Sequence, residues 1–558
     1  MKDSLTSPLS AVCASFIGVA PCVISKLKTG LALAALLALT ACGGGGADAE
    51  DNSGGSNNNS GGNPFTGSGG WTAGVYKAAD QYINQCAAPR SGNDPITGTA
   101  YPDRKGSVRD ENNFLRSWSN DTYLWYKEII DVNPANYKDP LEYFSLLRTM
   151  EITASGAPKD QFHFTYSSEE WDRLSESGIT YGYGLELSWI SAVPPRELIV
   201  AYTQPNSPAA MASIKRGAKL LKIDGVDLIN ANTNSDIDKL NTGLSPSTIG
   251  QAHTFTIEES GVIRDVVLQS ASVTNVPVQN VKTIDTPTGK VGYLTFNDHI
   301  APAEQGLIDA VNQLDAAGVN DLVLDLRYNG GGYLAIASQL AYMIAGYAPT
   351  VGKKFEELQF NDKYPTKNPV TGEALVPEPF YSTSLGFSVS QGQALPTLDL
   401  KRVFVLTSSD TCSASEALMN GLRGVGIQVI QIGRTTCGKP YGFYAQPNCG
   451  TTYFTVQFRG VNAKNFGDYS DGFSPASSDD SKARVLGCSV ADDYSRALGD
   501  PAEARLAAAL YYRTNNRCPL GVSSVGVMQK AASPLREVDG HLIKTEALKN
   551  KLMHVPRQ

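Results

Sequence analysis

Downstream of residue 277, short apolar runs alternate with longer amphipathic segments. The short runs are rich in Val, Leu, Ile and Phe, as is typical of buried strands, and they cover 291–296, 322–326, 403–406 and 429–432. The longer segments repeat apolar residues at helical spacing and cover 303–317, 333–344 and 415–422. This alternation predicts an α/β core. We expect one more helix over 500–512, with Asp500 as its cap and Pro501 in its first position.

Two other patterns precede this core. Apolar and aromatic residues between 107 and 165 cluster at helical spacing and predict a helical region. Between about 176 and 275 the pattern is that of a small β-rich module, in which Asp224-Gly225 marks a tight turn between apolar runs. A glycine-punctuated loop at 181–187 runs into a strand of this module, and a short helix is expected after Ser207.

The first 42 residues have the pattern of an export signal. Lys26 and Lys28 precede an apolar run at 31–39, which is too short to span a bilayer comfortably. The run ends at LTAC, where Cys42 resembles the lipidated cysteine of a bacterial lipobox. Residues 43–72 are largely Gly, Ser and Asn and predict a flexible tether. We therefore expect a lipoprotein of the bacterial cell envelope, held at the outer membrane and facing the periplasm or the cell surface. The alternative is an ordinary signal peptide with a cysteine near its cleavage site.

Length and composition narrow the class of protein. A chain of 558 residues exceeds what one core normally covers, so we expect several folded units. A net charge of −8 without any long basic run argues against a nucleic-acid partner.

Six cysteines follow Cys42, an even number that is typical of disulfides in an exported chain. Cys437 and Cys449 flank a short loop, and Cys488 and Cys518 bracket a helical segment. The remaining two are Cys86 and Cys412. Their connectivity stays open, and the alternative is that some of the six are free and buried.

Candidate chemistry begins at 325–333 (DLRYNGGGY), where a buried strand runs into three glycines and a helix. Glycines let the backbone approach a ligand closely and point N–H groups at developing negative charge. A phosphate-binding loop is excluded, because both its Gly-Lys-Ser/Thr ending and the G-x-G-x-x-G spacing are absent. A tight turn with no ligand is the other interpretation.

Ser413 lies where a predicted strand ends and a helix begins, within 407–416 (TSSDTCSASE). A hydroxyl at this place faces backbone N–H groups and the positive end of the helix, which suits a nucleophile. The segment from Ser413 to Glu416 also fits a capping box, which requires no catalysis. Spacing alone favours the cap.

Lys439 follows a predicted strand and a glycine, 26 residues after Ser413. A lysine acts as a base near neutral pH only if its pKa falls from about 10.4 towards 7, which burial can achieve. A lone lysine in a loop is by default a solvated surface residue.

In combination and order, these motifs resemble those of the C-terminal-processing (tail-specific) serine peptidases, relatives of tricorn protease. The resemblance covers roughly residues 107–515, and the β-rich module resembles a PDZ domain. It implies an α/β peptidase core of ClpP/crotonase-like αββ units, an N-terminal helical part and an inserted PDZ-like domain. The implied divisions are a signal peptide at 1–42, a tether at 43–72, a helical region at 73–175, the PDZ-like domain at 176–275, the peptidase core at 276–518 and a tail at 519–558.

The resemblance also implies roles for individual residues. Ser413 would be the nucleophile and Lys439 the general base of a serine endopeptidase that works through an acyl-enzyme. The backbone N–H groups of Gly331 or Gly332 and of Ala414 would bind the oxyanion. No metal or other cofactor is required, and none of the five histidines lies in the zinc-binding pattern His-Glu-x-x-His.

The module would bind its peptide at Tyr183, Gly184, Leu185 and Glu186, where backbone N–H groups would capture a substrate C-terminus. The partners expected are therefore protein or peptide substrates, together with a membrane reached through the lipid anchor.

The chain departs from the family where many members carry a Gln four residues after the lysine. Here that position is Phe443, and the nearby Gln446 is out of register. His163 is therefore kept as an alternative base, because tricorn-like relatives use a His before the PDZ domain. A second alternative is a non-catalytic, lipid-anchored peptide-binding adaptor on a degenerate peptidase scaffold.

Overall fold

The computed structural model describes residues 71–95, 98–246, 248–480 and 482–522. The signal segment, Cys42, nearly all of the tether and most of the tail lie outside these residues. Within the described part of the chain, no helix is both long and apolar enough to cross a bilayer.

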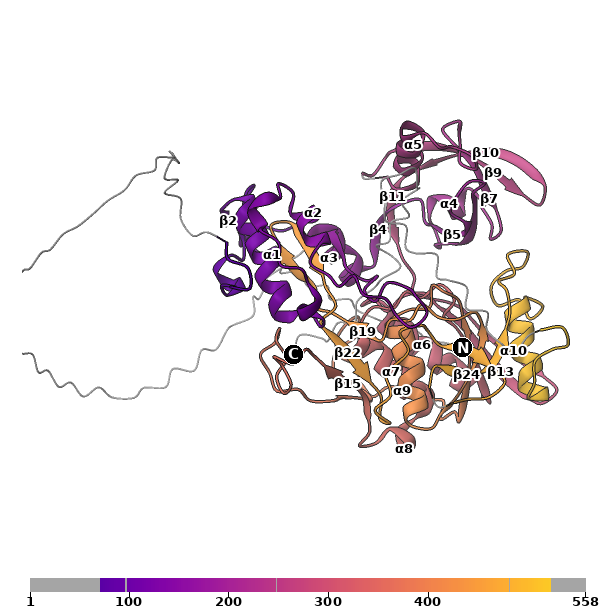
Figure 1. Cartoon of the computed structure of the whole chain (residues 1–558). Helices are drawn as coiled ribbons and strands as arrows, with labels where there is room; N and C mark the ends of the chain where they lie inside the picture. The colour runs from indigo at the N-terminus through magenta and orange to yellow at the C-terminus, as the bar shows by residue number, and fades with distance from the viewer. Residues whose placement is uncertain (1–70, 96–97, 247, 481, 523–558) are drawn as a thin grey trace, which may run out of the picture. The chain divides into compact units, whose positions relative to one another are not determined.

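A seven-stranded sheet forms the core predicted from the C-terminal half (Figure 1). Its strands, in spatial order, are β12 (Val278–Thr286), β13 (Gly289–Phe296), β14 (Asp321–Asp325), β17 (Arg402–Thr407), β18 (Gln428–Gly433), β24 (Arg484–Ser489) and β23 (Ser474–Ala476). β12 runs antiparallel to β13, and all other neighbours are parallel. Three neighbouring strands, β14, β17 and β18, therefore end at the same edge.

Helices cover both faces of this sheet. On one face, Leu322 and Leu324 pack against α6 (Ala303–Ala316), α7 (Leu334–Ala345) and α9 (Ala414–Gly424). On the other face, Val323 packs with the apolar side of α10 (Ala504–Asn515). Successive strand side chains point to opposite faces, so both faces are apolar and the strands read as continuous hydrophobic runs. These elements confirm the α/β part of the predicted fold.

The β-rich module is a separate sheet with its own apolar core. Its strands are ordered β10 (Val262–Gln269), β9 (Ala252–Glu259), β7 (Lys219–Ile223), β6 (Glu197–Thr203) and β5 (Leu185–Ser191), with β8 (Val226–Asp227) paired to β7. Its helices are α4 (Pro208–Met211) and α5 (Asn234–Leu244). The strands β4 (Ile179–Gly182) and β11 (Ala271–Thr274) pair at the two ends of the module's chain segment.

The region before the module is less helical than expected. Helix α1 (Val108–Thr122) starts on a Ser107 cap and ends before Tyr123, and α2 (Pro140–Ser145) is short. The strand β3 (Phe164–Ser167) pairs with β21 (Thr451–Phe454), which in turn pairs with β20 (Gln446–Asn448). The helix α3 (Ser168–Ser177) then leads into the module.

Four further strands, not predicted from the sequence, form a small sheet beside the core. They are β16 (Glu378–Pro379), β15 (Lys354–Gln359), β22 (Phe458–Val461) and β19 (Tyr441–Gly442).

The start of the last helix also differs from the prediction. Helix α10 begins at Ala504 and its cap is Glu503, whose carboxylate accepts the N–H of Leu506 at 3.0 Å. Asp500 and Pro501 lie in the preceding turn.

All six cysteines after Cys42 form disulfides, namely Cys86–Cys449, Cys412–Cys437 and Cys488–Cys518. Cys437 therefore pairs with Cys412, and not with the Cys449 that faces it across a short loop. Disulfides of this kind typically stabilise a folded chain by about 2–4 kcal/mol.

A fully buried arginine joins the core strands to the last helix. Arg327 donates to Asp325 at 2.9 Å, to Asp492 at 2.6 Å and to Glu503 at 2.8 Å. Burial alone would raise the pKa of Asp492, but the charges of Arg505, Arg327 and Arg216 lower it below its usual range. The pKa of Glu503 is likewise lowered, because its pairing with Arg327 outweighs burial.

We predict that Arg327→Met lowers the free energy of unfolding by about 3–5 kcal/mol in a denaturant titration at pH 7, because buried carboxylates lose their counter-charge. The control is Lys127→Met, which breaks an ion pair between the exposed side chains of Lys127 and Asp362 and should leave the free energy of unfolding nearly unchanged. The lowered pKa values of Asp492 and Glu503 add stability above about pH 4.5, which is lost as the pH falls further. Equal losses in the two variants would contradict the proposed role of Arg327.

Candidate active site

The three chemical motifs of the sequence meet at one edge of the central sheet. The glycine loop follows β14, Ser413 follows β17 and Lys439 follows β18. Because these strands are parallel neighbours, their carboxyl ends lie side by side, which is where open α/β sheets place their sites. The topology thus brings together residues that are about a hundred positions apart in the chain.

Ser413 occupies a strained turn immediately before α9. Its backbone has φ +57° and ψ −115°, a conformation that costs about 1–3 kcal/mol for a residue with a side chain. The residue is buried, and its Oγ has no hydrogen-bond partner among the described residues. Its N–H donates to the Glu416 carboxylate at 3.0 Å, so the Glu416 half of the expected capping box is formed.

The glycine loop lies against this turn. A Cβ placed on Gly331 would come within 2.7 Å of the Ser413 Cβ and 2.9 Å of the Ala414 nitrogen, so only glycine allows this approach. The N–H of Gly331 donates to Asn329 Oδ1 at 2.9 Å, so of the two glycines expected as oxyanion donors it is the one that already has an acceptor. Within the described chain, the N–H groups of Gly332 and Ala414 have no protein acceptor.

Lys439 is a buried lysine with unusual surroundings. Its side chain is fully covered, and its Nζ has no hydrogen-bond partner in the part of the chain that the structure describes. The Nζ lies 4.0 Å from the ring centre of Phe443 and 5.1 Å from that of Phe162. Burial lowers the pKa of Lys439 to about 7, although the charges of Asp160 and Glu416 oppose this shift. A substantial fraction of this amine is therefore neutral at neutral pH.

Phe443 thus takes the position of the glutamine that many family members carry. Its ring faces the Lys439 amine but offers it no hydrogen bond. The side chain of Gln446 donates to the Pro447 carbonyl, and Lys439 Nζ has no hydrogen-bond partner among the described residues. The position of Lys439 is therefore set by its backbone, whose N–H donates to Glu416.

The Glu416 carboxylate joins the turn that carries Ser413 to the loop that carries Lys439. Besides the N–H of Ser413, it accepts the N–H of Gly438 at 2.9 Å, the N–H of Lys439 at 2.8 Å and the Thr436 hydroxyl at 2.5 Å. Burial raises the pKa of Glu416 to about 7, although these hydrogen bonds favour the charged form. The sequence indicated Glu416 only as a capping residue, because the contact with Lys439 depends on the pairing of β17 with β18.

A disulfide adds a covalent connection at the same place. Cys412 directly precedes Ser413, and Cys437 lies two residues before Lys439, with their Cα atoms 5.2 Å apart. The sulfurs of both and the carboxylate of Glu416 lie within 4.8 Å of one another, but the disulfide occupies both sulfurs. This group is therefore not a metal site in the oxidised protein.

His163, the alternative base, has other partners. Its Nε2 lies 2.8 Å from the Phe144 carbonyl oxygen, its Nδ1 lies 3.2 Å from the Thr455 hydroxyl, and its ring stacks on Phe144. No hydrogen bond joins it to Ser413 Oγ, and none joins Lys439 Nζ to that atom either, so the distinction rests on the other contacts of His163. These contacts are those of a packed core histidine.

A second buried histidine, which the sequence analysis did not single out, supports the glycine loop. His299 receives the Tyr333 N–H on its carbonyl at 2.8 Å and donates its own N–H to the Gly331 carbonyl at 3.0 Å. Its Nδ1 lies 3.0 Å from Asn329 Oδ1, the atom that also accepts the Gly331 N–H. His299 lies outside any motif, so its position became visible only through the pairing of the loop with the segment after β13.

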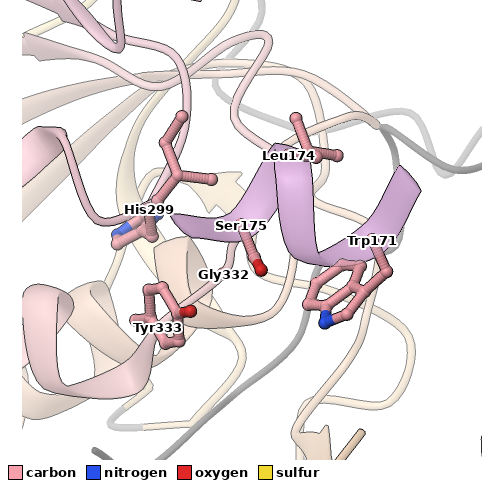
Figure 2. A pocket seen from close by; sticks show the side chains of 7 residues that line it. Trp171, Leu174, Ser175, His299, Gly332 and Tyr333 are labelled. Carbon is pink, nitrogen blue, oxygen red and sulfur yellow. The ribbon is translucent and has the colours of Figure 1, made fainter. Parts of the chain in front are cut away.

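An apolar pocket lies beside Gly332 (Figure 2). The helix α3 supplies one wall, and Figure 2 shows His299 and Tyr333 opposite it. The residues that line it are Trp171, Leu174, Ser175, His299, Ile300, Gly332 and Tyr333.

The loop predicted to bind peptides enters the outer strand of the module. Gly184 has φ +73°, and Leu185 begins β5, which pairs only with β6 within the described sheet. Glu186 lies in the same strand. The Tyr183 side chain is buried against Phe255, so this residue can offer a peptide only its backbone.

We predict that Glu416→Gln lowers the free energy of unfolding by about 2 kcal/mol or more, because an NH₂ group would face donors that now share a carboxylate. The control is Asp236→Asn at the exposed start of α5, where Asp236 accepts the Thr233 hydroxyl, and its expected cost is below about 1 kcal/mol. Denaturant titrations of both variants check this, and a loss at Glu416 no larger than that at Asp236 would refute the buried link.

Comparisons with known proteins agree with the motifs. Residues 290–445 match the model of peptidase family S41. The chain is 27% identical over 268 residues to a carboxyl-terminal-processing protease of Picosynechococcus, covering 48% of this chain and 56% of that protein. It is 25% identical over 261 residues to the chloroplastic carboxyl-terminal-processing peptidase 1 of Arabidopsis thaliana. That match covers 46% of this chain and 51% of the Arabidopsis protein. The match thus spans about half the length of these relatives.

A solved structure of a Bacteroides fragilis protein assigned to the S41 proteases superposes with a TM-score of 0.53 at 22% identity. The superposition covers 75% of this chain and all of the Bacteroides chain. At 22% identity it shows that the two proteins share a fold. Together with the order of the three motifs, these findings support the predicted relationship: residues 290–445 match a peptidase family S41 domain, and the chain is similar to C-terminal-processing proteases over about half of their length.

Proposed function

We propose that this protein is a serine endopeptidase with Ser413 as nucleophile and Lys439 as general base. The observation that carries the proposal is a pair of buried polar atoms, Ser413 Oγ and Lys439 Nζ, neither of which has a hydrogen-bond partner among the described residues. Buried polar groups without partners are costly and rare, so their retention at the end of two adjacent strands indicates a function.

The proposed mechanism follows from the chemistry of these groups, which do not hydrogen-bond to each other in this structure and would meet when a peptide binds. Neutral Lys439 accepts the proton of the Ser413 hydroxyl while its oxygen attacks the carbonyl carbon of a peptide bond. The N–H groups of Gly332 and Ala414 stabilise the oxyanion that forms, assisted by the positive end of α9. The Lys439 ammonium then protonates the leaving amine, and a water molecule hydrolyses the acyl group on Ser413.

Both catalytic side chains are fully covered in the structure. A peptide therefore reaches Ser413 only after a covering segment has moved. The same cover keeps water from the Lys439 amine, and this desolvation is what lowers its pKa.

The pocket beside Gly332 supports a preference for apolar residues at the cleavage point. It adjoins one of the proposed oxyanion donors, and its lining includes Trp171, Leu174 and Ile300. The pocket is nearly closed, with a volume of about 10 Å³, so a side chain next to the scissile bond would enter it only once the covering segment has moved, and an apolar one would gain most from leaving water there.

The β-rich module supports recognition of an extended peptide end. Its strand β5 is the last in the order of the module's sheet, and a peptide can add to the end of a sheet as a further strand. The loop at 183–186 would then supply N–H groups to a terminal carboxylate, as in a PDZ-like domain. The names of the relatives, which are carboxyl-terminal-processing proteases, favour substrate C-termini as the ligand.

The signal segment and Cys42 support attachment to a bacterial membrane by lipid. On this proposal the substrates are exported proteins, and the protein acts in the cell envelope. The competing proposal, a non-catalytic peptide-binding adaptor, is favoured only by Phe443 at the place of the family's glutamine, and the buried Lys439 with its lowered pKa argues against it.

Ser413→Ala should lower kcat for an unstructured protein substrate by about 10⁴-fold or more, because the acyl-enzyme cannot form. The control is Ser409→Ala in the same turn, where the serine is exposed and activity should persist. Labelling by a fluorophosphonate, read by mass spectrometry, should disappear in the Ser413→Ala variant and persist in the Ser409→Ala variant. Full activity of a folded Ser413→Ala protein would exclude this nucleophile, and peptide binding without turnover or labelling of the natural protein would establish the adaptor.

Lys439→Ala should lower kcat by about 10²–10⁴-fold, since the proton of Ser413 then has no acceptor. His163→Ala should lower thermal stability but leave the kcat of the folded fraction within about threefold, because His163 is a core residue whose loss costs packing. Both variants are compared in one cleavage assay. Loss of activity in the His163 variant together with a near-natural rate in the Lys439 variant would reverse the assignment.

Leu174→Trp should narrow the pocket and change specificity. For two peptides that differ only in Ala or Phe before the scissile bond, the ratio of kcat/KM should shift by about tenfold towards Ala. Leu141→Trp, on the exposed side of α2, is the control and should leave the ratio unchanged. An unchanged ratio in the Leu174 variant would mean that the pocket does not receive this side chain.

A further inference from the structure

The disulfide between Cys412 and Cys437 lies between the two halves of the proposed dyad. Its Cα atoms are 5.2 Å apart, with one adjacent to Ser413 and the other two residues before Lys439. The other two disulfides join segments outside the turn and loop that carry these residues.

The turn that carries Ser413 needs an external constraint. A residue with a side chain keeps a φ of +57° only where its surroundings determine the backbone fully. Cys412 provides such a constraint, since its N–H donates to the Asn329 carbonyl at 3.1 Å and its sulfur is bonded to Cys437. It is therefore tied to the glycine loop and to the lysine loop at once.

The loop that carries Lys439 needs an external constraint even more than the Ser413 turn does. Residues 435–440 contain no helix or strand, and the Lys439 amine makes no hydrogen bond with a described residue. Its place relative to Ser413 therefore depends on the backbone. The non-covalent ties are the Cys437 N–H to the Thr411 carbonyl, at 3.0 Å, and the hydrogen bonds to Glu416.

We propose that the Cys412–Cys437 disulfide is a positioning element of the catalytic site, so that peptidase activity requires it to be oxidised. This inference rests on the proposed function of Ser413 and Lys439. Opening the disulfide lets the lysine loop shift relative to the nucleophile, and a displacement of about 1 Å can cost about 100-fold in rate. It also admits water to the amine, which restores the charged form.

The chemistry of opening is a thiol–disulfide exchange with a dithiol. The attacking thiolate bonds to Cys437, whose side chain is only half-buried, and the Cys412 sulfur leaves and takes a proton. The second thiol of the reductant then displaces Cys437. The products are two protein thiols and one cyclic disulfide, so two electrons and two protons have passed to the protein.

The chain offers a matched control in Cys488–Cys518. It closes a loop of 30 residues, against 25 for Cys412–Cys437, so the two should constrain the unfolded chain to a similar extent. Cys488 packs with the α10 side of the sheet, whereas Cys412 packs with the aromatic residues around Lys439. A purely structural role predicts equal effects from removing either one.

The experiment compares full-length oxidised protein with C412A/C437A and C488A/C518A. Each is measured for melting temperature, for kcat and KM on one peptide, and for the pH dependence of fluorophosphonate labelling. We expect C412A/C437A alone to lose kcat by about tenfold to 100-fold with KM nearly unchanged. We also expect its labelling rate to reach its midpoint at a higher pH.

Equal kinetics in both double variants, or a natural kcat and pH midpoint in C412A/C437A, would overturn the inference. Should C412A/C437A not fold, the natural protein is treated with increasing dithiothreitol, and alkylation with mass spectrometry maps which disulfide has opened. Activity must then fall in proportion to the opening of Cys412–Cys437 and return on reoxidation. Activity that persists after this disulfide has opened would refute the inference. Inactivity of the untreated natural protein would instead count against the proposed function itself.

Discussion

The carboxylate of Glu416 accepts hydrogen bonds from both sides of the site, and the rest of the arrangement depends on this. Its Oε2 accepts the N–H groups of Ser413 and Lys439, and its Oε1 accepts the N–H of Gly438 and the Thr436 hydroxyl. These donors come from the ends of two different strands, β17 and β18. This buried carboxylate therefore links the turn that carries Ser413 to the loop that carries Lys439, neither of which lies in a helix or strand.

Burial acts on both ionisable groups of this cluster, in opposite directions. It raises the pKa of Glu416 and lowers that of Lys439, so that both approach 7. For Glu416, the raised pKa reflects the free-energy cost of burying a charged carboxylate, which four hydrogen bonds reduce. On the proposed function, the shift of the lysine makes base catalysis possible, because a neutral amine with a free electron pair exists near pH 7. The aromatic rings of Phe443 and Phe162 exclude water without binding the amine, which is consistent with a phenylalanine replacing a hydrogen-bonding glutamine.

Much of this could be predicted from the sequence, for physical reasons that differ from case to case. The strands at 322–326 and 403–406 were predictable because buried parallel strands are continuously apolar. Ser413 and Lys439 stood out as candidates because each follows such a strand at a glycine or a helix start, but their roles came from the family resemblance and stay a prediction. The roles of Glu416 and His299 were not, since both arise from contacts between segments that only the sheet order brings together. The pairing of Cys412 with Cys437 was open for the same reason, and Tyr123 lies beyond the end of α1 although the aromatic pattern continues through it.

The central claim is that about half of the Lys439 amine is neutral near pH 7. It is tested most directly by an NMR titration of the full-length protein labelled with ¹³C at lysine Cε, in which the Lys439 signal is assigned by its absence from Lys439→Arg. The account predicts one lysine that titrates with a pKa of about 7, while the exposed lysines titrate near 10.4. A Lys439 signal that titrates with the exposed lysines would contradict it.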